Sequence, residues 1–153
     1  MKIRLHLFFI LFCATLCTGP GHADTPDALI FHTSPESQAL GYPFSDAVEV
    51  DGWLYISGQI GADPEIDILA KGGIEGQTRQ TMDNIKSHME RLGLNMGRIV
   101  KCTVMLEEMA DWSAFNVTPF TEPILPPYPA RSALGADGLA LGAAVEVECI
   151  ARR

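Results

Sequence analysis

Apolar residues recur along the chain with two different periods, and these periods predict most of its secondary structure. Residues 47–50 and 53–60 each have the apolar pattern of a β-strand. Between them, Asp51-Gly52 suits the positive φ angles of a tight turn, so a β-hairpin is expected. From Ile74 to Leu92 the apolar positions recur every three or four residues, which predicts one long amphipathic helix. Gly93 follows as a residue that can adopt the left-handed conformation at a helix end.

The remaining pattern predicts three further strands and one short helix. The strands are expected at residues 98–109, at about 130–135 and at 143–151, with a loop at 136–142. Asp111 is expected to cap a short helix that Pro119 stops. Residues 24–40 predict an irregular lead-in, and His88, at the edge of the long helix's apolar stripe, is expected to be half-exposed rather than functional.

The order β-β-α-β-α-β-β predicts an α+β fold with two helices on one face of a mixed sheet. In residues 99–106 both alternating faces are largely uncharged, with Lys101 as the only charge. A sheet covered on one face alone should carry polar residues on the other. Since no other part of the chain remains to cover that second face, another subunit is the economical explanation.

Residues 1–23 have the layout of a secretory signal peptide. Lys2 and Arg4 precede a short apolar stretch, and small residues, Gly21 and Ala23, stand before the expected cleavage site. We expect cleavage after Ala23 and a periplasmic or secreted protein, with an uncleaved anchor as the less favoured alternative. Removing two basic and no acidic residues moves the net charge from −8 to −10, which disfavours nucleic acid as a partner.

Two cysteines remain after that cleavage, Cys102 and Cys149. In an extracytoplasmic protein they could form a disulfide. Because both lie in strand-like apolar patterns, two buried thiols that act as small apolar side chains are the favoured interpretation. His32 and His88 are the remaining histidines, and neither has carboxylates or thiols at metal-ligand spacing, so no metal site is expected.

One strand places two carboxylates on a face that should be covered. Glu146 and Glu148 alternate with apolar residues at 145, 147 and 149, so they point away from the helices. Arg131 is the nearest cationic candidate and is expected on an adjacent strand. Spacing alone favours a structural Arg–Glu pair at an interface, and the alternative is an anion-binding arginine beside an acid/base carboxylate.

Several separated motifs together resemble the Rid family, the YjgF-like reactive intermediate deaminases. They are GYPFSDAVEVDGWLYISGQIG, QTRQTMDNIKSHMERLGLNMGRIVKCTVML, FN and PARSALG…AAVEVECIA, and the resemblance covers about residues 41–153. It implies one Rid-like domain with a chorismate-mutase-like α+β fold. It also implies a homotrimer in which three sheets form a central barrel, with a cleft at each subunit interface.

The resemblance also implies roles for individual residues. Arg131 matches the arginine that grips the substrate carboxylate, and Glu146 matches the glutamate that positions and activates water. The matching cleft positions are Ser57, Gly58 and Asn116, whereas Phe44 replaces a common tyrosine and Ala133 a common cysteine. No metal or organic cofactor is implied, because an iminium carbon is already electrophilic.

The expected reaction is hydrolysis of a 2-imino acid, in equilibrium with its enamine, to a 2-keto acid and ammonia. The alternative is a trimer that binds small carboxylates such as 2-keto acids without turnover, which the changes at Phe44 and Ala133 favour. A ribonuclease or translation inhibitor, an activity sometimes attached to the family name, is disfavoured by the acidic charge and the leader.

Overall fold

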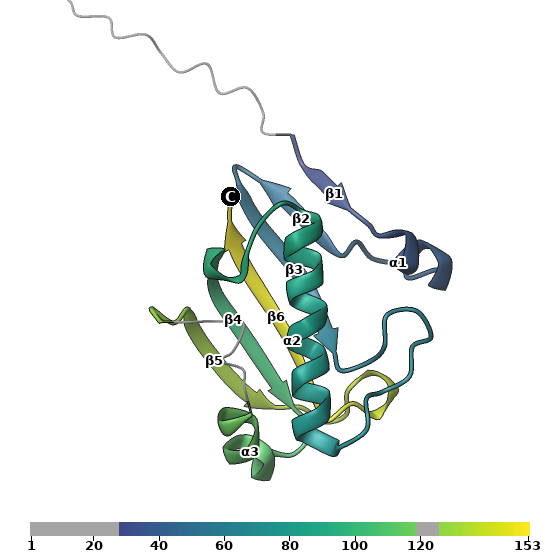
Figure 1. Cartoon of the computed structure of the whole chain (residues 1–153), viewed down its shortest axis with the longest axis vertical. Coiled ribbons are helices and arrows are strands. Elements are labelled where there is room, and N and C mark those ends of the chain that lie inside the picture. Colours follow the sequence, from purple (N-terminus) through teal and green to yellow (C-terminus); the bar gives the residue numbers. More distant parts are fainter. Residues whose placement is uncertain (1–27, 119–125) are drawn as a thin grey trace, which may run out of the picture.

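The computed structural model describes residues 28–118 and 126–153, which form one six-stranded sheet with helices packed against it (Figure 1). The predicted leader and Pro119 lie outside the described residues. The strands are β1 (Ile30–His32), β2 (Ala47–Val50), β3 (Trp53–Ile60), β4 (Ile99–Leu106), β5 (Ala130–Gly135) and β6 (Val145–Arg152). The α-helices are α1 (Pro35–Leu40), α2 (Gly73–Arg91) and α3 (Trp112–Val117), and short 3-10 turns cover Met96–Arg98, Met109–Asp111 and Ala140–Gly142.

The strand order is β1-β2-β3-β6-β4-β5, so the C-terminal strand lies near the middle of the sheet. All neighbouring pairs are antiparallel except β4 and β5, which run parallel. The predicted mixed α+β class is therefore confirmed. The expectation that Arg131 lies on a strand adjacent to that of Glu146 is wrong, because β4 lies between β5 and β6.

The hairpin between β2 and β3 is confirmed. Asp51 and Gly52 both have positive φ, 52° and 70°, which is the backbone of a two-residue turn that follows the natural twist of paired strands. The hairpin sets the register of Ala47 against Ile56, and the other edge of β3 pairs with β6.

Helix α2 packs its predicted stripe onto the sheet. Met82, Ile85 and Met89 are at most 1% exposed and contact the inward residues of β4 and β6 in one core cluster. Phe115 of α3 belongs to the same cluster, so α2 and α3 cover the same face of the sheet. The helix ends as expected, with Gly93 at φ 74° and its N–H donating to the Glu90 carbonyl.

The segment expected to be an irregular lead-in instead contains β1 and α1. Ser34 caps α1 by accepting a hydrogen bond from the Ser37 N–H, Pro35 occupies the first turn, and Gly41 ends the helix in the left-handed conformation. The helix has only six residues, too few to show an apolar period. Strand β1 has three residues and forms because the edge of β2 offers it a partner.

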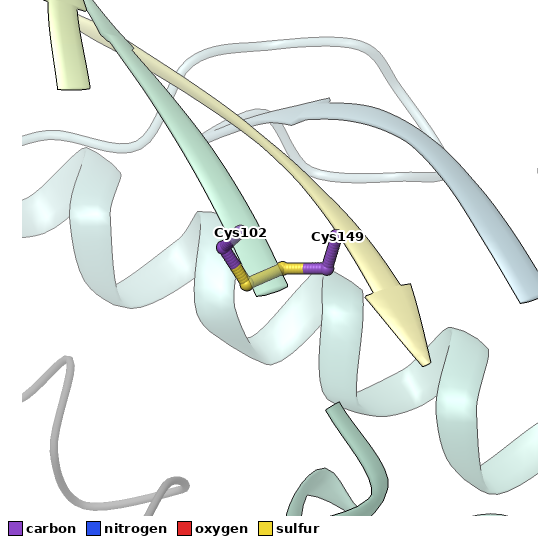
Figure 2. Close-up of a disulfide and its surroundings, with 2 residues drawn as sticks. All are labelled: Cys102 and Cys149. Carbon is purple, nitrogen blue, oxygen red and sulfur yellow. A yellow bond between two sulfur atoms is a disulfide. The ribbon is translucent and has the colours of Figure 1, made fainter. Parts of the chain in front are cut away.

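The expectation of two free, buried thiols is wrong, because Cys102 and Cys149 form a disulfide (Figure 2). The two residues are directly opposite each other on the antiparallel strands β4 and β6, and both side chains face the buried side of the sheet. This register could not be read from the sequence, since 47 positions separate the two cysteines.

Helix α3 is present as predicted, but Asp111 does not cap it. Its side chain makes no capping hydrogen bond, because the preceding 3-10 turn already gives Asp111 helical backbone angles. The short turn and α3 together bring Trp112 and Asn116 alongside strand β5, as their contacts with Arg131 show.

The second face of the sheet carries large apolar side chains that the described chain leaves exposed. Tyr55 of β3 is 50% exposed and Leu134 of β5 is 48% exposed. They point away from the helices, since their strand neighbours Leu54, Ile56 and Ala133 pack into the core. No helix within the described residues is long and apolar enough to cross a membrane.

Candidate active site

The strand register divides the candidate residues into two groups. The carboxylate half comprises Phe44, Ser57, Gly58, Glu146 and Glu148, and the arginine half comprises Trp112, Phe115, Asn116, Arg131 and Ala133. Glu146 is in register with Met105, on the open face of β4. Arg131 is in register with Cys102, whose side chain lies on the helix-covered face. One chain therefore does not bring Arg131 and Glu146 together.

The two halves are separated by distance as well as by the direction of their side chains. Cys102 and Met105 are three residues apart on β4, which is about 10 Å along the strand, and β5 and β6 are two strand spacings apart, about another 10 Å. A small imino acid could not contact both side chains within a single chain. A site that uses both residues must combine the halves of two copies.

A β-bulge forms the floor of the carboxylate half. The pairing of β3 with β6 shifts register between Ile56 and Gln59, so Ser57 and Gly58 together stand opposite Glu148. The Glu146 side chain lies over this bulge: a Cβ on residue 58 would overlap its Oε1. Only glycine leaves room for the carboxylate there.

The environment of Glu146 changes its acidity. Burial raises the pKa of this carboxyl above its ordinary value, and the negative charge of Glu148 raises it further. Glu148 itself is exposed. A raised pKa brings a carboxylate closer to the range in which it can both accept and return a proton near neutral pH.

The loop before β2 is fastened to this bulge. The Ser57 Oγ donates to the Ser45 carbonyl at 2.6 Å, and the Ser57 N–H donates to the Asp46 carbonyl at 2.9 Å. In the same loop, Phe44 is 50% exposed and stacks on Tyr42 with ring centroids 5.1 Å apart. Phe44, Ser57, Gly58 and Glu146 are therefore held in one structural unit, as expected for one side of a cleft.

Arg131 lies against helix α3. Its Nη2 donates to Asn116 Oδ1 at 2.7 Å, and its guanidinium carbon is 5.1 Å from the ring centroid of Trp112 and 5.6 Å from that of Phe115. Asn116 in turn donates from Nδ2 to the Trp112 carbonyl, which fixes its amide. These contacts orient the planar fork of the guanidinium, a group that can bond both oxygens of a carboxylate.

Ala133 follows Arg131 on the same side of β5. It is partly buried and packs against the core, in register with Val104. It contributes no polar side-chain group, so this position can offer a ligand only its backbone. Within the described residues, no group of three or more histidines, cysteines or carboxylates is arranged to hold a metal ion.

The sequence pattern did not indicate the aromatic rings that contact Arg131, nor the residues that bind the bulge from its buried side. Trp112 and Phe115 could have been found from their spacing, since they precede Asn116 by four residues and one residue on a short helix. His88 was expected to be half-exposed and without a role. Its side chain is instead 13% exposed and bonds to Gln59, the residue that follows the bulge.

Comparisons with known proteins place the chain in a family and match its fold. The family model described as Endoribonuclease L-PSP matches residues 35–153. A goat (Capra hircus) protein named 2-iminobutanoate/2-iminopropanoate deaminase is 37% identical over 122 residues, covering 80% of this chain and 88% of its own. The crystal structure of RidA from the Antarctic bacterium Psychrobacter sp. PAMC 21119 is 36% identical, with a TM-score of 0.69 over 74% of this chain and 90% of its own. The YjgF gene product of E. coli is 32% identical, with a TM-score of 0.70 over 80% of this chain and 98% of its own.

Proposed function

This chain belongs to the Endoribonuclease L-PSP family, which is the Rid family of the sequence resemblance, and we propose that it hydrolyses 2-imino acids to 2-keto acids and ammonia. The observation that carries the proposal is the setting of Glu146, a carboxyl of raised pKa held over a glycine in a β-bulge. The goat relative named for this reaction supports it. The ribonuclease in the family's description is not carried over, because the expected mature charge of −10 repels a phosphate backbone.

Each half of the site has a distinct task in this reaction. Arg131 binds the carboxylate of the imino acid and so orients its C=N carbon. Glu146 accepts a proton from water as the water oxygen bonds to that carbon, and a carbinolamine forms. Glu146 then returns the proton to nitrogen and takes up the proton of the carbinol hydroxyl as the C–N bond breaks, so that ammonia leaves and the 2-keto acid remains. The family's chemistry needs neither a metal nor an organic cofactor.

The proposal includes a homotrimer whose clefts lie between subunits. Two observations support it: Arg131 and Glu146 lie on opposite faces of one chain, and the open face exposes Tyr55 and Leu134. A neighbour that covers the open face would bury those side chains and bring its own Arg131 toward Glu146. Closed rings of this kind are built from one repeated head-to-tail contact.

Two inactive variants test whether the site is shared. Arg131→Ala and Glu146→Gln should each abolish turnover when expressed alone. When they are co-expressed, about a quarter of the clefts of randomly mixed rings combine an intact Arg131 from one chain with an intact Glu146 from another. We expect activity to return to about that fraction. Continued inactivity of proven mixed oligomers would contradict a shared site.

The direct test of the reaction uses imines generated in place by an amino-acid oxidase. Semicarbazide captures the imine that remains, so an imine hydrolase lowers the semicarbazone signal and raises the rate of keto-acid release. We expect acceleration by the purified protein and none by Arg131→Ala. If no small, aliphatic or aromatic imine is accelerated, the alternative holds, in which the trimer binds small carboxylates without turnover, as the loss of a hydroxyl at Phe44 suggests.

We also propose that the protein works outside the cytoplasm, in the periplasm or as a secreted protein. The layout of residues 1–23 supports export, and the disulfide between Cys102 and Cys149 supports an oxidising compartment. The mass of the exported protein should correspond to a chain that begins at Asp24. A cytoplasmic protein of full length with free thiols would contradict this proposal.

A further inference from the structure

The bulge under Glu146 is held from its buried side by one glutamine. Gln59 Nε2 donates to the carbonyls of both Ser57 and Gly58, each at 3.2 Å. A bulge interrupts the regular ladder of hydrogen bonds, so its backbone groups need other partners. Gln59 supplies a donor for the carbonyl of each bulge residue, while the Ser57 N–H donates to the Asp46 carbonyl.

The orientation of Gln59 is set by His88 of helix α2. Since the Gln59 amide nitrogen donates to the bulge, its Oε1 is an acceptor, and His88 Nε2 lies 3.0 Å from it. His88 Nε2 must therefore carry the proton. The other ring nitrogen, Nδ1, then accepts from Arg91 Nη2. Both nitrogens of a neutral imidazole are used, in one defined tautomer.

Arg91 is in turn held by a buried carboxylate. Its Nη2 donates to Asp46 Oδ2 at 2.8 Å, and Asp46 is 2% exposed. Asp46 also accepts from the Ser34 N–H and the Ser37 hydroxyl. An unbroken series of contacts thus runs from helix α1 through Asp46, Arg91, His88 and Gln59 to the bulge.

The charges around His88 favour the neutral form that this series requires. Burial lowers the pKa of His88, and Arg91 lowers it further, while the charges of Asp46 and Glu36 oppose these effects without reversing them. For Asp46, burial would raise the pKa, but the hydrogen bonds from Ser37 and Ser34 outweigh it and lower the pKa. His88 is therefore neutral beside an ionised Asp46.

We propose that His88 is a positioning residue for the deaminase site: acting through Gln59, it fixes the Ser57–Gly58 bulge on which the Glu146 carboxylate lies. The inference rests on the proposed function, since it assigns His88 a task in that reaction. His88 lies on the buried side of β3 and does not contact the substrate. Its hydrogen bond restricts the position of the backbone segment over which the reacting carboxylate lies.

A matched pair of variants separates the hydrogen bond from simple packing. His88→Leu fills similar space without a donor, whereas His88→Gln keeps an N–H that can reach Gln59 Oε1. We expect kcat to fall about tenfold in His88→Leu, because small displacements of a reacting group are expensive, while KM changes less than about twofold because Arg131 is unaffected. His88→Gln should restore most of kcat.

A second readout does not depend on turnover. The pKa of Glu146, followed by NMR of its side-chain carboxyl carbon, should fall toward its ordinary value in His88→Leu, since a relaxed bulge lets water reach the carboxylate. His88→Gln should stay near the wild type. His32→Leu is the control, because His32 is also a partly buried histidine but its side chain bonds to Glu49 instead of Gln59.

Two results would overturn the proposal. One is a folded His88→Leu protein with unchanged kcat and an unchanged pKa of Glu146, and the other is an equal loss in His88→Gln. If His88→Leu does not fold, the nitrogen shifts of His88 in the wild type still decide, since an Nδ1–H tautomer or a charged ring at neutral pH contradicts the contacts described. If the wild type hydrolyses no imine, the proposed function fails, but the pKa comparison still tests the role of His88.

Discussion

The two halves of the candidate site are built in different ways. The carboxylate half lies on β3 and β6, two strands in the interior of the sheet, and the bulge beneath Glu146 is hydrogen-bonded to the preceding loop and to Gln59. The arginine half lies on the edge strand β5 and on α3, a helix of six residues. In the sheet interior, burial can change the acidity of Glu146. At the edge of the sheet, Arg131 can reach a neighbouring molecule.

This contrast explains how one small domain can provide two different functional groups. A carboxylate that moves protons needs partial burial, a nearby like charge and a fixed backbone. An arginine that binds a carboxylate keeps its charge wherever it lies, so it needs orientation more than burial. Aromatic faces and one amide provide that orientation for Arg131.

The largest expected effects come from changing Glu146 and Arg131, and they should differ in whether ligand binding is lost. Glu146→Gln should lower kcat by about a thousandfold, as loss of general acid–base catalysis does, while binding of a 2-keto acid remains close to that of the wild type. Arg131→Ala should lose both binding and turnover. Calorimetric titration with a 2-keto acid, beside the oxidase-coupled assay, measures the two quantities. Loss of binding in Glu146→Gln would show that the roles assigned here are wrong.

A smaller effect is expected from one added methyl group. In Gly58→Ala the new Cβ would occupy the position of the Glu146 Oε1, so the carboxylate must move, and kcat should fall about a hundredfold. Gly97→Ala is the control, because its Cβ would meet only the end of the Asn95 side chain, at 3.1 Å. Steady-state kinetics and a crystal structure of the variant check this result, and an undisplaced Glu146 with normal kcat would contradict it.

The sequence predicted those parts of the fold that depend on local pattern. The hairpin at Asp51-Gly52, helix α2 and its end at Gly93 follow from turn chemistry and apolar period, and all three are confirmed. The alternation in β6 also predicted correctly that Glu146 and Glu148 point away from the core. Each of these inferences needs only residues that are close together along the chain.

Apart from the missed helix α1 and the capping role expected of Asp111, the errors concern relations between distant segments. The pairing of Cys102 with Cys149, and the insertion of β4 between β5 and β6, depend on sheet topology, which local patterns do not contain. The role inferred for His88 depends on helix α2 crossing β3 at Gln59. The same limit applied to Arg131: the family resemblance implied that it binds a carboxylate, but the face of the sheet on which it lies required the strand register.

A change at Glu148 should alter the acidity of the carboxylate half without changing its position. Glu148→Gln removes the negative charge that raises the pKa of Glu146, so that pKa falls. Because the base must be ionised, activity is lost as pH falls through this pKa, and the acidic limb of the kcat profile should move to lower pH. Glu90→Gln removes a surface charge elsewhere and should leave the limb unchanged. A shift to higher pH in Glu148→Gln would contradict the cause assigned here.

The smallest expected effect tests the orientation of the arginine half. The indole of Trp112 faces the Arg131 guanidinium, and such contacts contribute about 0.5–1 kcal/mol at exposed sites, which corresponds to about two- to fivefold in affinity. Trp112→Leu should therefore raise KM and the dissociation constant of a 2-keto acid by that factor, with kcat nearly unchanged because Glu146 lies elsewhere. Trp112→Phe keeps an aromatic face and should recover most of the affinity. If Trp112→Leu instead lowers kcat with no change in KM, Trp112 contributes to the carboxylate half, and the division of the site into two independent halves is wrong.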